Sequence, residues 1–176
     1  TSSIMFLTVF RTIFFSSFLF QFYSNKGFTL VYDDTLLKNK ILDNNTGRRH
    51  RAVLLYNQSL IEQKEGKLGE ALRHAKKANS LAPEFVPAAV QTARLLQREG
   101  KRRKAAAVIE EAWVSNPHPH LADVMDELAP GAGPQERMRT LENLASYNKN
   151  HEESHLAIAK AALAAGMLQV AREHLE

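Results

Sequence analysis

Residues 66–83 read GKLGEALRHAKKANSLAP, and residues 100–117 read GKRRKAAAVIEEAWVSNP. The second stretch begins 34 residues after the first, and both place small residues and proline in the same order. The shared residues are Gly66, Ala71, Ala78 and Pro83, which recur as Gly100, Ala105, Ala112 and Pro117. Glycine suits the residue after a helix end, where φ is positive, alanine lets two helices approach closely, and proline ends a helix. The pattern therefore predicts repeated pairs of antiparallel helices.

A 34-residue period with this order of residues is typical of the tetratricopeptide repeat, whose helix pairs stack and cover each other's apolar sides. The sequence thus predicts an all-α solenoid. We expect units at about 52–85, 86–119, 120–151 and 152–176, the last ending inside its second helix. The expected helices are 52–65 and 68–81, 86–99 and 102–115, 120–128 and 135–147, 152–165, and one beginning near residue 168.

The composition changes near residues 47–51. Eight of the nine Phe precede residue 29, no Ala precedes Ala52, and 23 Ala lie from there to the end. In residues 1–47, the apolar run 4–23 is long enough for a helix that spans about 30 Å of hydrocarbon, although Arg11 near its middle costs about 2.5–3.5 kcal/mol. Two interpretations stay open: a membrane helix and polar linker before a repeat domain at 48–176, or a leader that is not native to that domain.

Charge and cysteine content exclude several function classes. The chain has no Cys, which excludes disulfides, thiolate zinc sites and cysteine nucleophiles. Its net charge of +4 is compatible with an anionic partner or a membrane surface. No aromatic platform interleaves the basic residues, so we expect no nucleic-acid partner.

The repeat region also resembles the C-terminal region of the HemY family of bacterial inner-membrane proteins, over about residues 48–176. The stretches that carry the resemblance are LAPEFVPAA at 81–89, ARLL at 93–96, EAW at 111–113, PHPHLA at 117–122, RMR at 137–139, LENL at 141–144 and ESHLA at 153–157. The family's usual pattern has two N-terminal membrane helices and more repeats, whereas this chain has one apolar stretch.

The resemblance implies a non-enzymatic, membrane-associated scaffold of haem (porphyrin) biosynthesis. It implies a bacterial inner (cytoplasmic) membrane location with the repeats in the aqueous phase, and haem-pathway enzymes as protein partners. It transfers no catalytic residues and no cofactor. The alternative, which depends on the repeats alone, is a general tetratricopeptide protein-interaction module without a porphyrin role.

Residues 151–155 read HEESH, a literal match to the H-E-x-x-H pattern of zinc hydrolases. In the repeat register, His151 precedes the fourth first-helix and should stay in water, while His155 lies in its first turns and should turn toward the packing. A zinc hydrolase needs both imidazoles on one mid-helix face, with the first Glu as general base. Glu152 and Glu153 instead suit a helix N-terminus, where carboxylates are favourable. We therefore expect no metal site, and zinc hydrolysis is the remote alternative function.

Two further groups are candidate ligand contacts. His118 and His120 flank Pro119 and can form a haem contact, since neutral imidazole is a common axial ligand, or a solvated turn. The basic run Arg98, Lys101, Arg102, Arg103 and Lys104 can face anionic lipid or porphyrin carboxylates, or can be a solvated turn.

The concave side of a repeat array is formed mostly by the first helix of each unit, and extended partner segments bind there. The residues expected to line it and to contact a partner are Tyr56, Leu60, Gln63, Lys64, Val90, Arg94, Gln97 and Arg98. Trp113, on a second helix, is expected in the core between units.

Overall fold

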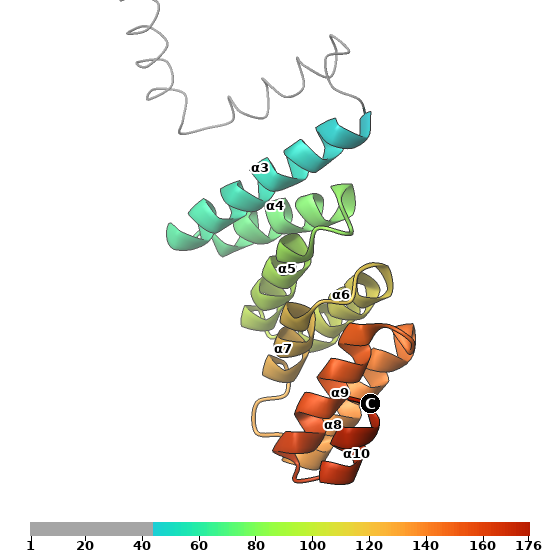
Figure 1. Cartoon of the computed structure of the whole chain (residues 1–176). Helices are drawn as coiled ribbons and strands as arrows, with labels where there is room; N and C mark the ends of the chain where they lie inside the picture. Colours follow the sequence, from blue (N-terminus) through green and yellow to red (C-terminus); the bar gives the residue numbers. More distant parts are fainter. Residues whose placement is uncertain (1–43) are drawn as a thin grey trace, which may run out of the picture.

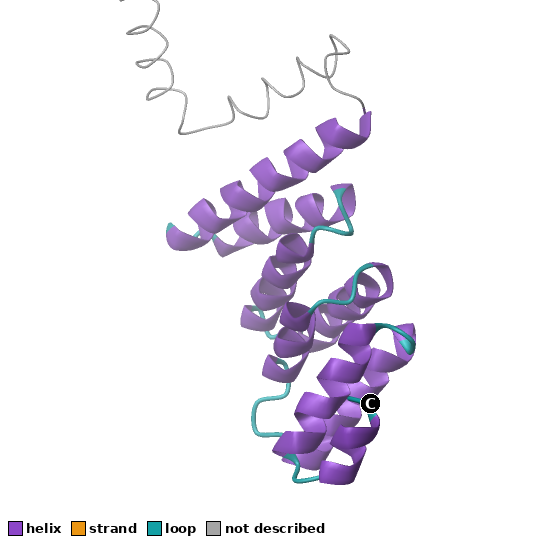
Figure 2. Ribbon diagram, viewed as in Figure 1, coloured by secondary structure: helices purple, strands orange, loops and turns teal. Residues whose placement is uncertain are grey.

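The computed structural model describes residues 44–176, which form helices joined by short connections, with no strand in that range (Figures 1 and 2). The elements are α3 (Asn44–Lys64), α4 (Leu68–Leu81), α5 (Val86–Arg98), α6 (Arg102–Ser115), α7 (Pro119–Glu127), α8 (Pro134–Ala145), the short 3-10 helix η1 (Ser146–Asn148), α9 (Glu152–Ala164) and α10 (Leu168–Glu173). The prediction of an all-α body is confirmed for this range. The expected membrane helix at 4–23 lies outside the described residues. From residue 44 onward, no helix has the length and apolar character needed to cross a bilayer.

Most helix boundaries lie within one or two residues of the predicted ones, and α3 is the exception. It begins at Asn44, eight residues before the expected start at residue 52, and so runs through the composition break at 47–51. A change of composition is not a helix-ending signal, and no proline or positive-φ glycine interrupts this segment. Arg49 also pairs with Glu84 at 2.9 Å, which attaches the added turns to the α4–α5 connection.

The helices pack in sequence along an elongated stack that runs from α3 at one end to α10 at the other (Figure 1). Helix α3 packs on α4, α5 on α6 and α9 on α10, and α4 joins the first pair to the second through α5. The third pair is looser, because α8 packs more extensively on α9 than on α7. Its connection, residues 128–133, is longer than the three-residue turns at 65–67 and 99–101 and holds the two helices less closely.

The small residues of the repeat lie where helices approach each other. Ala71, Ala78 and Ala105 are fully buried, and Ala112 is nearly so. Gly66 and Gly100 have φ of +79° and +74°, as expected for the residue after a helix end. Both parts of the sequence prediction are confirmed.

Trp113 is also fully buried, as expected for a residue between units. Its indole Nε1 donates a hydrogen bond to Ser154 Oγ at 3.3 Å, and Ser154 Oγ donates to the carbonyl of Asn148 at 2.7 Å. These bonds link α6 to the start of α9, 41 residues further along the chain.

A buried polar cluster that the sequence did not predict joins α3 to α4. His74 Nδ1 lies 2.6 Å from Glu62 Oε2, and only 5 % of the Glu62 side chain is exposed. Gln58 Nε2 donates to the other carboxyl oxygen of Glu62 at 3.0 Å. Because buried polar groups are costly without partners, these bonds favour one alignment of the two helices.

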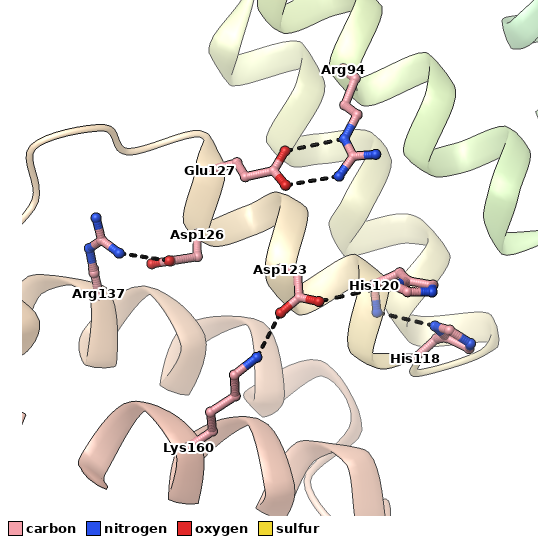
Figure 3. A network of polar contacts seen from close by, with 8 residues as sticks. All are labelled: Arg94, His118, His120, Asp123, Asp126, Glu127, Arg137 and Lys160. Atoms are coloured by element: carbon pink, nitrogen blue, oxygen red, sulfur yellow. Dashed lines mark hydrogen bonds and ion pairs between the residues drawn. The ribbon is translucent and has the colours of Figure 1, made fainter. Parts of the chain in front are cut away.

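Helix α7 carries three carboxylates that form ion pairs with neighbouring helices (Figure 3). Its three carboxylates each pair, at 2.8 Å, with a cation from a different helix. The pairs are Glu127 with Arg94 of α5, Asp126 with Arg137 of α8, and Asp123 with Lys160 of α9. The short helix α7 is therefore held from three sides.

Candidate functional site

A groove of about 480 Å³ lies between α3, α5 and the start of α7. Its lining residues are Tyr56, Leu60, Val86, Pro87, Val90, Gln91, Arg94, His118 and His120. Four of the predicted partner-contacting residues, Tyr56, Leu60, Val90 and Arg94, thus come together with both histidines of the His-Pro-His turn. From the sequence, the first-helix residues and the two histidines were separate candidate sites. Helix α7 packs against α5 and brings them together.

The apolar part of the groove is formed by α3 and α5. Tyr56, Leu60 and Val90 are each only partly buried, so they present apolar surface to the groove. The Tyr56 ring packs edge-on against Phe85, with ring centroids 5.5 Å apart and planes at 86°. Such a perpendicular contact is favourable for aromatic rings and fixes the position of Tyr56.

One wall of the groove is a buried amide bridge between α3 and α5. Gln91 is 7 % exposed, and its Nε2 donates to Gln63 Oε1 at 2.6 Å and to Ser59 Oγ at 3.3 Å. Gln63 was predicted to face a partner, whereas the structure engages its amide oxygen inside the protein and leaves it out of the groove lining. Gln63 forms this bond because it lies beside α5, the first helix of the next unit. That position depends on how the helix pairs stack and not on the local sequence.

Arg94 is a positioned cation. Its guanidinium donates to both carboxyl oxygens of Glu127, from Nη2 at 2.8 Å and from Nε at 3.2 Å (Figure 3). The hydrogen bonds to Glu127 are the main cause that raises the pKa of Arg94 above its usual value, so the group stays protonated. Gln97, another predicted contact, donates from Nε2 to the backbone carbonyl of Glu127 at 2.8 Å. Both side chains thus connect α5 to α7.

The two histidines lie where α7 begins. His118 is the N-cap residue, and its Nδ1 accepts a hydrogen bond from the backbone N–H of His120 at 3.2 Å. The neutral ring of His118 therefore carries its proton on Nε2. His120 is exposed, and its ring centroid lies 4.9 Å from that of His118 (Figure 3). Its Nδ1 is 3.9 Å from Asp123 Oδ2.

Lys64 and Arg98, the last two predicted contacts, occupy the final turns of α3 and α5 and are exposed. Neither belongs to the groove lining. They lie instead beside the turns that lead into α4 and α6, close in sequence to Lys67 and to the basic run at 101–104.

The H-E-x-x-H stretch straddles the start of α9, as the repeat register predicted. His151 is the N-cap, and its Nδ1 accepts from the backbone N–H of Glu153 at 3.1 Å. The expectation that His151 stays in water is wrong, because capping holds the ring partly buried against the helix. His155 turns to α10, with its Nδ1 at 3.0 Å from Nδ1 of His174. Within residues 44–176, no group of three or more His, Asp or Glu has the geometry to hold a metal ion.

A second hollow, of about 390 Å³, lies between α7, α8 and α9 and was not predicted. It is lined mainly by small apolar residues, including Ala122, Ala132, Ala157 and Ala161, and is bordered by the Asp123–Lys160 and Asp126–Arg137 pairs. Ala157 and Ala161 are one helical turn apart, and this spacing was the available sequence signal.

Comparison of the sequence with protein-family models gives no match, and comparison with curated proteins gives none. The likeness to the HemY family therefore depends on the residues quoted above.

Proposed function

We propose that residues 44–176 are a tetratricopeptide-type array that acts without catalysis, as a scaffold, and binds an extended segment of a partner protein in the groove between α3, α5 and α7. The 34-residue period, the positive-φ glycines after the first helices and the buried alanines support this assignment. The single observation that carries the binding proposal is the groove itself, in which four of the eight predicted first-helix residues meet the His118–His120 turn.

The chemistry of the groove suits a peptide segment. Tyr56, Leu60 and Val90 offer apolar contact for one or two side chains, and His120 and Arg94 at the border can donate hydrogen bonds to backbone carbonyls or a carboxylate. Arg94 is already oriented by Glu127, so less side-chain freedom is lost when it binds.

The test is photo-crosslinking from the groove. A photoreactive phenylalanine analogue replaces Tyr56 in one protein and Val114 in a control, since Val114 is exposed on α6 and absent from the groove lining. We expect partner adducts from position 56 that disappear when Val90→Asp is added, and none of the same adducts from position 114. Identical adducts from both positions would contradict the groove as the binding site.

In a narrower second proposal, the chain is a scaffold of haem biosynthesis at the bacterial inner membrane. Residues 4–23 would attach it to the membrane, and its protein partners would be haem-pathway enzymes. The HemY-like residues and the presence of His118 and His120 in the groove beside Arg94 favour it. Titration of haem or protoporphyrin should then shift the Soret band, and His118→Ala with His120→Ala should abolish the shift. No shift in the unmodified protein would leave the protein-binding scaffold and remove the porphyrin contact.

A further inference from the structure

Two turns of the stack lie on the same side of the molecule. The α3–α4 turn (65–67) and the α5–α6 turn (99–101) each close an antiparallel helix pair, and the pairs follow one another through α4 and α5. Figure 2 shows these turns on one side of the stack and the α4–α5 and α6–α7 connections on the other. The two turns therefore belong to the same side of the stack, opposite the α4–α5 and α6–α7 connections.

Basic side chains concentrate at these two turns. They are Lys64, Lys67, Arg98, Lys101, Arg102, Arg103 and Lys104, which together we call the basic edge. Lys67 pairs with Glu65 and Lys101 with Glu99, both at 2.7 Å. The other five are exposed and form no ion pair with any residue of the described range 44–176. The basic edge thus carries a net excess of unpaired positive charge.

Helix stability does not explain three of these cations. Arg102, Arg103 and Lys104 form the first turn of α6, which has no acidic residue there and no side-chain cap. Cations are unfavourable at the positive end of a helix dipole. By contrast, α9 begins with Glu152 and Glu153 behind a capping His151. A local rule broken without a structural gain is expected at functional positions.

Exposed aliphatic side chains accompany the cations. Ile61 and Leu68 flank the α3–α4 turn and are 47 % and 39 % exposed. Cations interspersed with exposed aliphatic groups are the chemistry of proteins that lie on a membrane surface, where the cations meet anionic headgroups and the aliphatic groups enter the interface.

We propose that the basic edge docks on the anionic phospholipid headgroups of a membrane, with Ile61 and Leu68 entering the interfacial layer. This inference is separate from the groove: Tyr56, Leu60, Val90 and the histidines are not needed for it, and the groove lining contains no residue of the basic edge. Lys64 and Arg98, predicted as partner contacts, are assigned here to lipid.

The test is co-sedimentation of the full chain with vesicles of phosphatidylcholine alone or mixed with phosphatidylglycerol. The variant Arg102→Gln/Arg103→Gln/Lys104→Gln is compared with Arg73→Gln/Lys76→Gln/Lys77→Gln, which removes the same charge from exposed positions of α4. Any contribution of residues 1–43 is common to all three proteins. Glutamine is a good helix former, so both variants should fold, as far-UV circular dichroism will verify.

We expect binding to the anionic vesicles that weakens with added salt and falls about tenfold or more in the α6 variant, while the control falls far less. Leu68→Ser should weaken binding more than Val114→Ser. Equal loss in the two triple variants, or equal binding of the unmodified chain to neutral and anionic vesicles, would overturn the proposal. A third outcome is that the chain does not bind anionic vesicles but binds poly-glutamate, and that this binding is lost in the α6 variant. The basic edge would then recognise an acidic protein segment, and the lipid proposal would be wrong.

Discussion

At the scale of the residue, Gly100 shows most directly how one side chain permits the fold. Its φ of +74° lies in the left-handed region, and a β-carbon placed there would meet no other atom within 4 Å. The glycine is therefore required by the backbone conformation and not by crowding. Gly69 is the useful comparison, because it lies in α4 with no positive φ and equally open surroundings.

Gly100→Ala should lower the free energy of unfolding by about 1–2 kcal/mol, the cost of a left-handed conformation for a residue with a β-carbon. Gly69→Ala should raise it by about 0.5–1 kcal/mol, because alanine is the better helix former. Urea unfolding of both variants measures the difference. If both changes had the same sign, the turn conformation would not be the cause.

Glu84 is the residue whose ionisation should affect stability. Its own backbone N–H and the Arg49 guanidinium donate hydrogen bonds to the carboxylate, and they hold its pKa below the ordinary 4.5. A lowered pKa means that the folded protein favours the charged carboxylate. The stabilising contribution is thus complete above pH 4.5 and is lost as the pH falls through the lower, folded-state value.

Glu84→Gln should therefore lower stability more at pH 7 than at pH 2, because the carboxylate loses its charge as the pH falls through its lowered pKa. Thermal unfolding at the two pH values provides the comparison. Glu142→Gln, on an exposed position of α8 with no ion pair among the described residues, serves as the control. An effect of Glu84→Gln that is as large at pH 2 as at pH 7 would exclude the charge as its origin.

At the scale of the element, the first turns of α9 and α6 differ in how well their side chains suit a helix N-terminus. Helix α9 begins with a capping imidazole and two carboxylates, whereas α6 begins with three cations and no side-chain cap. Both helices are buried on one side by the same kind of alanine-rich packing. Core packing therefore does not account for the difference between their first turns. That difference lies in the side chains that face solvent or a partner.

Arg103→Glu should raise the free energy of unfolding by about 0.3–1 kcal/mol, because a carboxylate replaces a cation at the positive end of α6. The same change should weaken binding to anionic vesicles. Lys76→Glu, in the middle of α4, makes the same change of charge at an exposed position. It should raise the free energy of unfolding less and weaken vesicle binding less than Arg103→Glu. Thermal unfolding together with co-sedimentation measures both effects, and a destabilised Arg103→Glu would refute this view of the α6 start.

At the scale of the whole molecule, contacts between residues far apart in sequence hold the stack together. Arg94 reaches Glu127 across 33 residues, Lys160 reaches Asp123 across 37, and Trp113 reaches Ser154 across 41. The first two pairs are largely exposed, and such pairs contribute little to stability. The buried Trp113–Ser154 bond should matter more.

Ser154→Ala leaves the buried Trp113 N–H without its partner and removes one of the two hydrogen bonds to the Asn148 carbonyl, which keeps the bond from the His151 N–H at 3.2 Å. The change should cost about 1–3 kcal/mol. Ser115→Ala, an exposed position on α6, should change stability by less than about 0.5 kcal/mol. Trp113 is the only tryptophan of the chain, so its fluorescence follows this junction directly. Unfolding midpoints from fluorescence that are the same for Ser154→Ala and the unmodified protein would show that the bond does not couple α6 to α9.

The sequence by itself determined the helices, the turns and the buried small residues. These features repeat every 34 residues and depend on local preferences: glycine for a positive φ, proline for a helix end, alanine for a close crossing. Ala105 and Gly100 could therefore be assigned without any structure. The start of α3 could not, because the change of composition near residue 47 coincides with no local stop signal.

Only the tertiary structure decided which side chains share a surface. It placed His118 and His120 beside Tyr56 and Val90, engaged Gln63 with Gln91, and left Lys64 and Arg98 at the turns. It also turned His155 toward His174 and opened the hollow between α7, α8 and α9. Each of these depends on how one helix pair rotates against the next, an angle set by the summed packing of distant side chains and not by local sequence preference.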